Sequence, residues 1–120
     1  MNQKVLQAVE YMKGPHSCSQ SVLCAFCEDA VLTYDDAKKI AAPYSGGRAI
    51  KCGALYAGEL VLKAKFGEDT NLVDELDEKF LKSVGAINCR EIRSKNLRPC
   101  IGCVEESATI LDKIISASNF

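Results

Sequence analysis

The sequence predicts an all-α fold, a single-domain bundle of about five to seven short and medium helices. Three observations support this prediction. Apolar residues recur with the helical period, strand-like alternation is scarce, and glycines or prolines separate the periodic segments. With 120 residues, of which 48% are apolar and 26% charged, the chain can bury one core, so residues 1–120 are expected to form one domain.

Three helices are expected in the first half of the chain. Gly14 and Pro15 end the first, and Asp35 and Asp36 favour the start of the third. The expected ranges are about 2–13, about 18–31, and from about 35 to 43–47. The second helix offers four residues to the core, which are Val22, Leu23, Phe26 and Ala30.

The second half of the sequence predicts a helix from Cys52 to about Phe66, closed by Gly67. It also predicts a helix over about 70–83, capped by Asp69 or Thr70. A short turn over 88–94 precedes a last helix from Pro99 to about Ala117. The helix after Cys52 carries a stripe of small residues that would let another helix approach within the chain or, less favoured, across a homodimer. These small residues are Ala54, Ala57, Gly58 and Val61. The apolar face of the last helix comprises Val104, Ala108, Leu111 and Ile115.

The charge balance excludes two classes of partner. Fifteen basic and sixteen acidic residues leave a net charge of −1, which gives no electrostatic case for nucleic acid or an anionic membrane. The start of the sequence lacks the layout of a secretory signal, and no apolar run could span a bilayer. We therefore expect a cytoplasmic, reducing setting, where an odd count of seven cysteines argues against a disulfide scaffold.

Four cysteines fall at predicted helix starts: Cys18, Cys52, Cys89 and Cys100. The first turn of a helix presents unpaired N–H groups and about half a positive charge. A thiolate there is stabilised, and its pKa can fall from about 8.5 towards about 3.5–7.5. The same N–H groups can donate to the sulfurs of a metal–thiolate centre. The glycines before Cys52 would permit a close backbone approach.

The other three cysteines form two CxxC motifs with their neighbours. Cys24 and Cys27 lie within the second predicted helix and are interpreted as core residues. Cys100 and Cys103 form a more typical functional pair, because Pro99 places the first of them at a helix start. Cys103 could be a resolving thiol, a substitute ligand or an apolar contact.

Three other polar residues lie close to the thiols in the sequence. His16, the single histidine, is interpreted as a loop residue rather than a ligand. Arg48 and Arg90 are close in sequence to two of the thiols and could offset thiolate charge, although solvation at the surface also explains them.

The segments around the four cysteines resemble a known family. "CSQSV" at 18–22, "CGALYAG" at 52–58, "CREI" at 89–92 and "CIGCVEESATIL" at 100–111 are similar to the redox-active proteins named for their C…GCAxxG…C…C pattern. Carried over, the four cysteines of that family fall on Cys18, Cys52, Cys89 and Cys100, and the resemblance implies a redox role. The chain is also similar to the non-haem part of some split-soluble dihaem cytochromes, which implies a [2Fe–2S] centre.

The leading hypothesis is a redox protein in which Cys18, Cys52, Cys89 and Cys100 ligate one metal centre, a [2Fe–2S] cluster, and exchange electrons with an unknown partner protein. One alternative is a thiol–disulfide protein in which Cys100 or Cys52 attacks and a neighbour such as Cys103 resolves. A structural zinc site and a helical interaction module with incidental cysteines are the others. Whether the protein is an enzyme stays open.

Overall fold

Helices are the regular elements of the computed structural model, which describes residues 3–44 and 51–118. Its bounds are α1 Gln3–Lys13, α2 Cys18–Ala25, α3 Tyr34–Ala41, the 3₁₀ turn η1 Ala42–Tyr44, α4 Gly53–Phe66, α5 Leu72–Val84, α6 Cys89–Ser94 and α7 Cys100–Ser118. The described residues contain no strand, so the all-α prediction is confirmed. None of these helices combines the length and apolar character needed to cross a bilayer.

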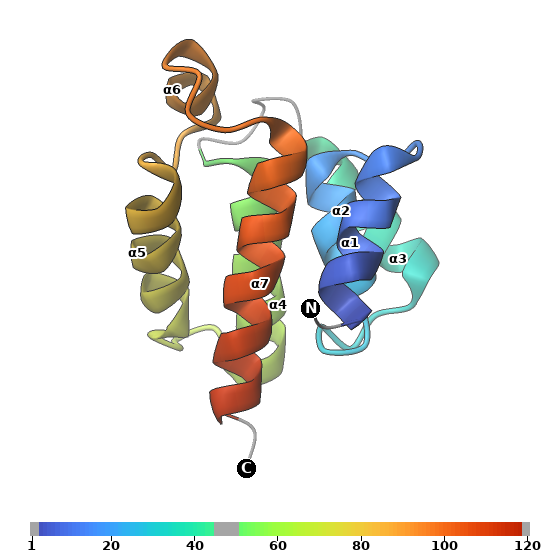
Figure 1. The fold of residues 1–120 in the computed structure, drawn as a ribbon. Helices are drawn as coiled ribbons and strands as arrows, with labels where there is room; N and C mark the ends of the chain where they lie inside the picture. Colours follow the sequence, from blue (N-terminus) through green and yellow to red (C-terminus); the bar gives the residue numbers. More distant parts are fainter. Residues whose placement is uncertain (1–2, 45–50, 119–120) are drawn as a thin grey trace.

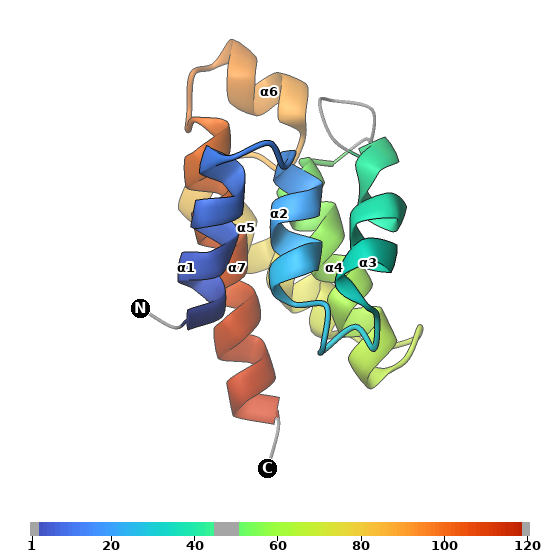
Figure 2. The same ribbon diagram turned by 90° about the vertical axis from the view of Figure 1, so that its right-hand side faces the viewer.

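Helices α2, α4 and α7 form the centre of the bundle. α7 packs against α1, α2, α4 and α5, while α4 also packs against α2 and α5. In Figure 1, α5 lies on one side of α7, and α1, α2 and α3 lie on the other. The short helix α6 sits at one end, where α2, α4 and α7 all begin (Figures 1 and 2).

The apolar faces predicted from the helical period form the core. Phe26 and Phe80 are its largest fully buried side chains, and the chain buries them because large apolar surfaces gain most from leaving water. The residues that the sequence assigned to the core from the second and the last predicted helix are all buried. They are Val22, Leu23, Phe26, Ala30, Val104, Ala108, Leu111 and Ile115.

Two predicted boundaries are wrong. The second helix ends at Ala25 rather than near residue 31, and a series of turns follows it. Val31 adopts a φ of 57°, which a right-handed helix cannot continue through. The sequence pattern concealed this end because Phe26 and Ala30 keep helical spacing in the turns and remain buried. In α5 the N-cap is Asn71 instead of Asp69 or Thr70.

The small-residue stripe of α4 packs inside the chain, as favoured from the sequence. A Cβ atom on Gly58 would lie 2.9 Å from the Leu76 side chain of α5 and 3.2 Å from the Ser107 hydroxyl of α7. The Ser107 hydroxyl donates a 2.9 Å hydrogen bond to the Ala54 carbonyl, which fixes α7 against α4. The absence of a side chain at residue 58 therefore sets how closely three helices approach.

Replacing Gly58 with valine should lower the free energy of unfolding by about 1–3 kcal/mol, because the added methyl groups overpack the contact between α4, α5 and α7. Urea denaturation followed by circular dichroism measures this loss. The matched variant Ala64→Val changes an exposed position of the same helix and should cost only about 0.5 kcal/mol in helix propensity. Equal losses in the two variants would contradict the packing argument.

Candidate functional site: a cavity lined by five cysteines

Five of the seven cysteines surround one cavity at the end of the bundle where α6 lies. Its volume is about 20 Å³, and Ile92, Arg93 and Arg98 complete its wall. All seven cysteines are present as thiols. The five in the wall are Cys18, Cys52, Cys89, Cys100 and Cys103. The four cysteines chosen from their helix-start positions thus converge in space, together with Cys103; their role as ligands stays a prediction.

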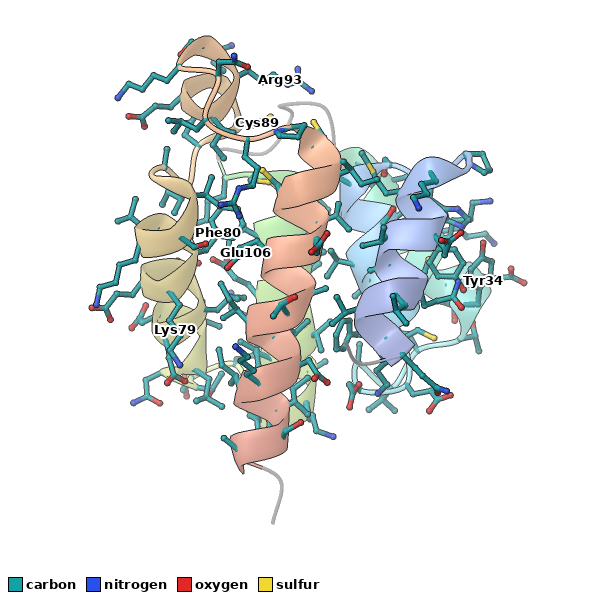
Figure 3. The ribbon with its side chains drawn as sticks, viewed as in Figure 1. Tyr34, Lys79, Phe80, Cys89, Arg93 and Glu106 are labelled. Atoms are coloured by element: carbon teal, nitrogen blue, oxygen red, sulfur yellow. The ribbon has the colours of Figure 1, made fainter. Side chains whose placement is uncertain are left out.

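Local capping places Cys18 and Cys89 at the first positions of their helices. Ser17 is the N-cap of α2, and its side chain and that of Gln20 form a capping box, so the next residue, Cys18, begins the helix. Asn88 caps α6 in the same way, because its side chain accepts from the N–H groups of Arg90 and Glu91. Figure 3 shows Cys89 at this end of the molecule.

Cys100 and Cys103 lie one turn apart in α7, which begins directly after Pro99. Proline favours such a start because its ring fixes φ and it has no N–H to leave unpaired. Cys103 is 2% exposed, whereas Cys100 is half-buried. Cys103 was predicted only as a possible substitute ligand; its CxxC spacing from Cys100, one helical turn, is the signal that places it in the same wall.

Glycine at position 53 allows the start of α4 to approach α2. A Cβ atom there would lie 2.6 Å from the Tyr44 carbonyl oxygen and 2.7 Å from the Cys18 sulfur. Tyr44 also stacks on Tyr56 of α4, with ring centroids 4.5 Å apart. The glycines expected to permit a close approach, Gly46 and Gly47, lie outside the described residues; among the described residues, Gly53 allows this contact.

Two interactions fix the backbone at Cys52, the N-cap residue of α4. Its N–H donates a 2.7 Å hydrogen bond to the Ile87 carbonyl, which links it to the segment before Cys89. The preceding residue, Lys51, donates to Glu59 of α4 and Asp77 of α5, each at 2.6 Å. Glu59 is 5% exposed, and its burial raises the pKa of this carboxyl to about 7. Lys51 therefore ties the entry to α4 to two helices.

The electrostatics of the thiols differ from the simple helix-start prediction. A side-chain interaction with Cys103 and burial both raise the pKa of the Cys52 thiol. Burial also raises the pKa of Cys89. The predicted lowering is wrong for these two thiols, because the interaction with Cys103 together with burial at Cys52, and burial at Cys89, outweigh the helix ends. The hydrogen bond from Cys52 instead lowers the pKa of Cys103, which the sequence did not single out as the thiolate.

The arginines at the cavity are not those expected. Arg93 and Arg98 line it, and the Arg93 guanidinium lies 3.9 Å from the Cys100 sulfur. Figure 3 shows Arg93 on α6, beside Cys89. Arg90 is exposed on α6 and does not line the cavity, and Arg48 lies outside the described residues. The helical period explains the difference, since Arg93 follows Cys89 by one turn and shares its face.

The remaining candidate residues lie elsewhere. Cys24 is buried at the end of α2, where burial raises its pKa to about 11, and Cys27 lies in the following turn. Cys24 belongs to the core and the half-buried Cys27 packs against it, so the interpretation as core residues is confirmed, and both also line a separate groove beside α1. His16 lies in a loop, where its ring packs against Tyr11 and Tyr34 and its Nε2 atom contacts the Tyr34 hydroxyl.

The thiols as they stand do not form a ready site for one ion. Among residues 3–44 and 51–118, no three side chains of Cys, His, Asp or Glu are placed so that they could hold a single metal ion together. The volume of about 20 Å³ accommodates about one water molecule. The donor chemistry suits a metal–thiolate centre, but the cavity must widen to receive one.

The fold and this cavity define a class of protein, an all-α, cysteine-rich protein with converging thiols. The sequence pattern of the family described as "Putative redox-active protein (C_GCAxxG_C_C)" matches residues 16–114. Because the match covers most of the chain, the protein belongs to this family, and the resemblance found in the sequence is confirmed. Comparison with curated proteins and with solved structures gives no significant match.

Replacing Lys51 with methionine should reduce the free energy of unfolding by about 2 kcal/mol, because it leaves the largely buried carboxylates of Glu59 and Asp77 without their cation. Chemical denaturation at neutral pH gives this value. The control Lys82→Met removes an exposed 4.0 Å pair with Glu78 and should cost less than about 0.5 kcal/mol. If both variants lose the same small amount, Lys51 is not an anchor.

Replacing Cys52 with alanine should raise the pKa of Cys103 in reduced, metal-free protein, because Cys103 loses the hydrogen bond that favours its thiolate. The pH dependence of the Cys103 ¹³Cβ chemical shift measures the change, with the wild-type thiol titrating at the lower pH. Cys24→Ala is the control and should leave the Cys103 titration unchanged. An unchanged titration in Cys52→Ala would show that the two thiols do not interact.

Proposed function

We propose that this protein is an electron carrier whose Cys18, Cys52, Cys89 and Cys100 bind one metal centre, a [2Fe–2S] cluster. The observation that carries the proposal is the convergence of these four thiols, distant in sequence, on one cavity. A [2Fe–2S] cluster takes four cysteine thiolates, and when bound it supplies a site that gains and loses one electron.

The surroundings favour a negatively charged thiolate centre. The N-terminal ends of α2, α4, α6 and α7 carry the cavity cysteines, and each brings a partial positive charge. Arg93 adds a positive charge in its wall, and Arg98, which pairs with Glu106 at 3.1 Å, lies there too. Hydrogen bonds and charges around the sulfurs set the reduction potential of such centres. In this protein these groups would raise the potential by stabilising the reduced, more negative form.

A two-iron centre and a single ion make different demands on the thiols. A structural zinc ion requires four donors at about 2.3 Å from one point, whereas each iron of a [2Fe–2S] cluster takes two protein ligands. Metal analysis distinguishes the two.

Widening of the cavity would come from α6. This helix carries Cys89, Ile92 and Arg93 into the wall, yet it packs extensively against none of the other described helices. The walls formed by α2, α4 and α7 are held by the core of the bundle. A small outward shift of α6 would give space, at the cost of partly exposing Cys89 and the core residue Ile92.

A second candidate is thiol–disulfide exchange, which the hydrogen bond between Cys52 and Cys103 favours. The Cys103 thiolate would attack one sulfur of a substrate disulfide and release the other as a thiol or thiolate. Cys52, after losing its proton, would attack the Cys103 sulfur and release the second substrate thiol. The pair would thus pass two electrons and the Cys52 proton to the substrate, and the second proton would come from solvent. This assigns the attack to Cys103, in place of the Cys52 or Cys100 predicted from the sequence.

Anaerobic reconstitution with iron and sulfide tests the leading proposal. We expect two irons and two acid-labile sulfides per chain, visible charge-transfer bands and a one-electron redox transition. Alanine variants of Cys18, Cys52, Cys89 or Cys100 should each lose at least about tenfold in iron retention under a competing chelator. Cys24→Ala and Cys27→Ala, which alter thiols outside the cavity, should retain the wild-type iron content.

Three other results would contradict the cluster. A colourless protein that binds one zinc ion per chain would support the structural alternative. A metal-free protein with a two-electron couple that disappears in Cys103→Ala would support thiol–disulfide exchange. Iron that survives in all four alanine variants would exclude the proposed ligands.

A further inference from the structure

One edge of the cysteine cavity carries more positive than negative side chains. The segment from Cys89 to Arg98 holds four cations and one anion in a chain whose net charge is −1. Arg98 is paired with Glu106 at 3.1 Å and Lys95 with Glu91 at 2.8 Å. The cations of this segment, here called the basic edge, are Arg90, Arg93, Lys95 and Arg98.

Two arginines of the basic edge are not neutralised by carboxylates. Arg90 and Arg93 make no ion pair with any residue in the part of the chain that the structure describes, and both are exposed. Arg90 also occupies the second position of α6, where a positive charge opposes the partial charge of the helix end. Its position therefore does not serve the stability of α6, and a residue that breaks such a local preference is a candidate for function.

The basic edge is also where the sulfurs come nearest to solvent. Cys18 and Cys100 are the half-buried thiols of the cavity, and the exposed Arg93 side chain reaches the Cys100 sulfur. Leu97, 39% exposed, adds an apolar contact among the charges. Electron transfer weakens steeply with distance, so a partner that exchanges electrons with the cavity has to dock against α6.

We propose that the basic edge is the docking surface for an acidic redox protein, which exchanges electrons with the cavity across α6. This inference rests on the proposed electron-carrier function and names the chemistry of its partner. Encounters between electron carriers bury little surface, so one short helix and its flanking loop suffice. Charge complementarity would speed the encounter and make it dependent on ionic strength.

An acidic protein fits the basic edge better than nucleic acid or a membrane does. Within the basic edge, the cations that make no ion pair with a described residue are Arg90 and Arg93, and the chain as a whole is slightly negative. Affinity for nucleic acid comes from many phosphate contacts, and polybasic membrane attraction requires a cluster of several cations. Weak, orientated attraction by a few charges is instead typical of transient protein encounters.

The test uses flavodoxin, an acidic one-electron carrier, as the probe and cytochrome c as the basic counterpart. Binding to the full-length chain is followed by amide chemical shifts at low ionic strength, first with reduced, metal-free protein and then after reconstitution. We expect shifts confined to α6 and its flanks with flavodoxin, none with cytochrome c, and loss of binding as salt is added.

Charge reversal supplies the decisive comparison. The double variant Arg90→Glu/Lys95→Glu should weaken flavodoxin binding at least about tenfold, whereas Lys79→Glu/Lys82→Glu, an equal charge change on α5, should change it less than about twofold. Lys79 lies on α5, away from α6 (Figure 3). Neither Arg90 nor Lys95 lines the cavity, and glutamate at position 90 suits the start of a helix, so α6 should persist in the variant.

The outcomes separate this inference from the proposed function. Binding at α6 by protein that acquires no iron would uphold the docking surface while the cluster proposal fails. Electron transfer that is equally fast in both double variants would overturn the docking surface while the cluster stands. Equal weakening by the two double variants, or binding of single-stranded DNA or phosphatidylserine vesicles but not flavodoxin, would also overturn it.

Discussion

The cysteine cavity depends on the close approach of α4 to the start of α2. Gly53 lies so near to the Tyr44 carbonyl and the Cys18 sulfur that a side chain at this position would collide with both. The approach brings the entry to α4, with Cys52, beside the start of α2, with Cys18. Lys51 holds the same entry against α4 and α5, and the Cys52 N–H holds it against Ile87. The positions of the other thiols follow from these contacts and from the core of the bundle.

Burial and helix ends act on the thiols in opposite directions. The positive ends of four helices favour negative sulfur, whereas burial disfavours charge, and burial prevails at Cys52 and Cys89. Without a counter-charge these thiols remain protonated. A metal cation would remove that obstacle, because it neutralises the thiolates while the N–H groups stabilise the net negative centre. The conflict between the two effects therefore suits a metal centre better than a set of bare thiolates.

Helix α6 combines two roles that usually belong to different elements. It contributes a thiol and an arginine to the wall of the cavity, and it presents the basic edge to solvent. Because its contacts with the bundle depend mainly on the buried residues Cys89 and Ile92, a shift would disturb only this edge of the core. The same freedom that would admit a cluster would let a docked partner influence the environment of Cys89 and Cys100. Binding of a partner and the potential of the centre would then be coupled.

The sequence by itself determined the helices, their buried faces and the four cysteines at helix starts, because helical periodicity, capping residues and glycine or proline breaks act over a few neighbouring residues. It also indicated the family through short segments around those cysteines. Three outcomes required the three-dimensional arrangement: Cys103 joins the cavity, Arg93 and Arg98 line it whereas Arg90 does not, and the pKa of Cys103 is lowered. Those outcomes depend on burial and on contacts between distant segments, which no local pattern records.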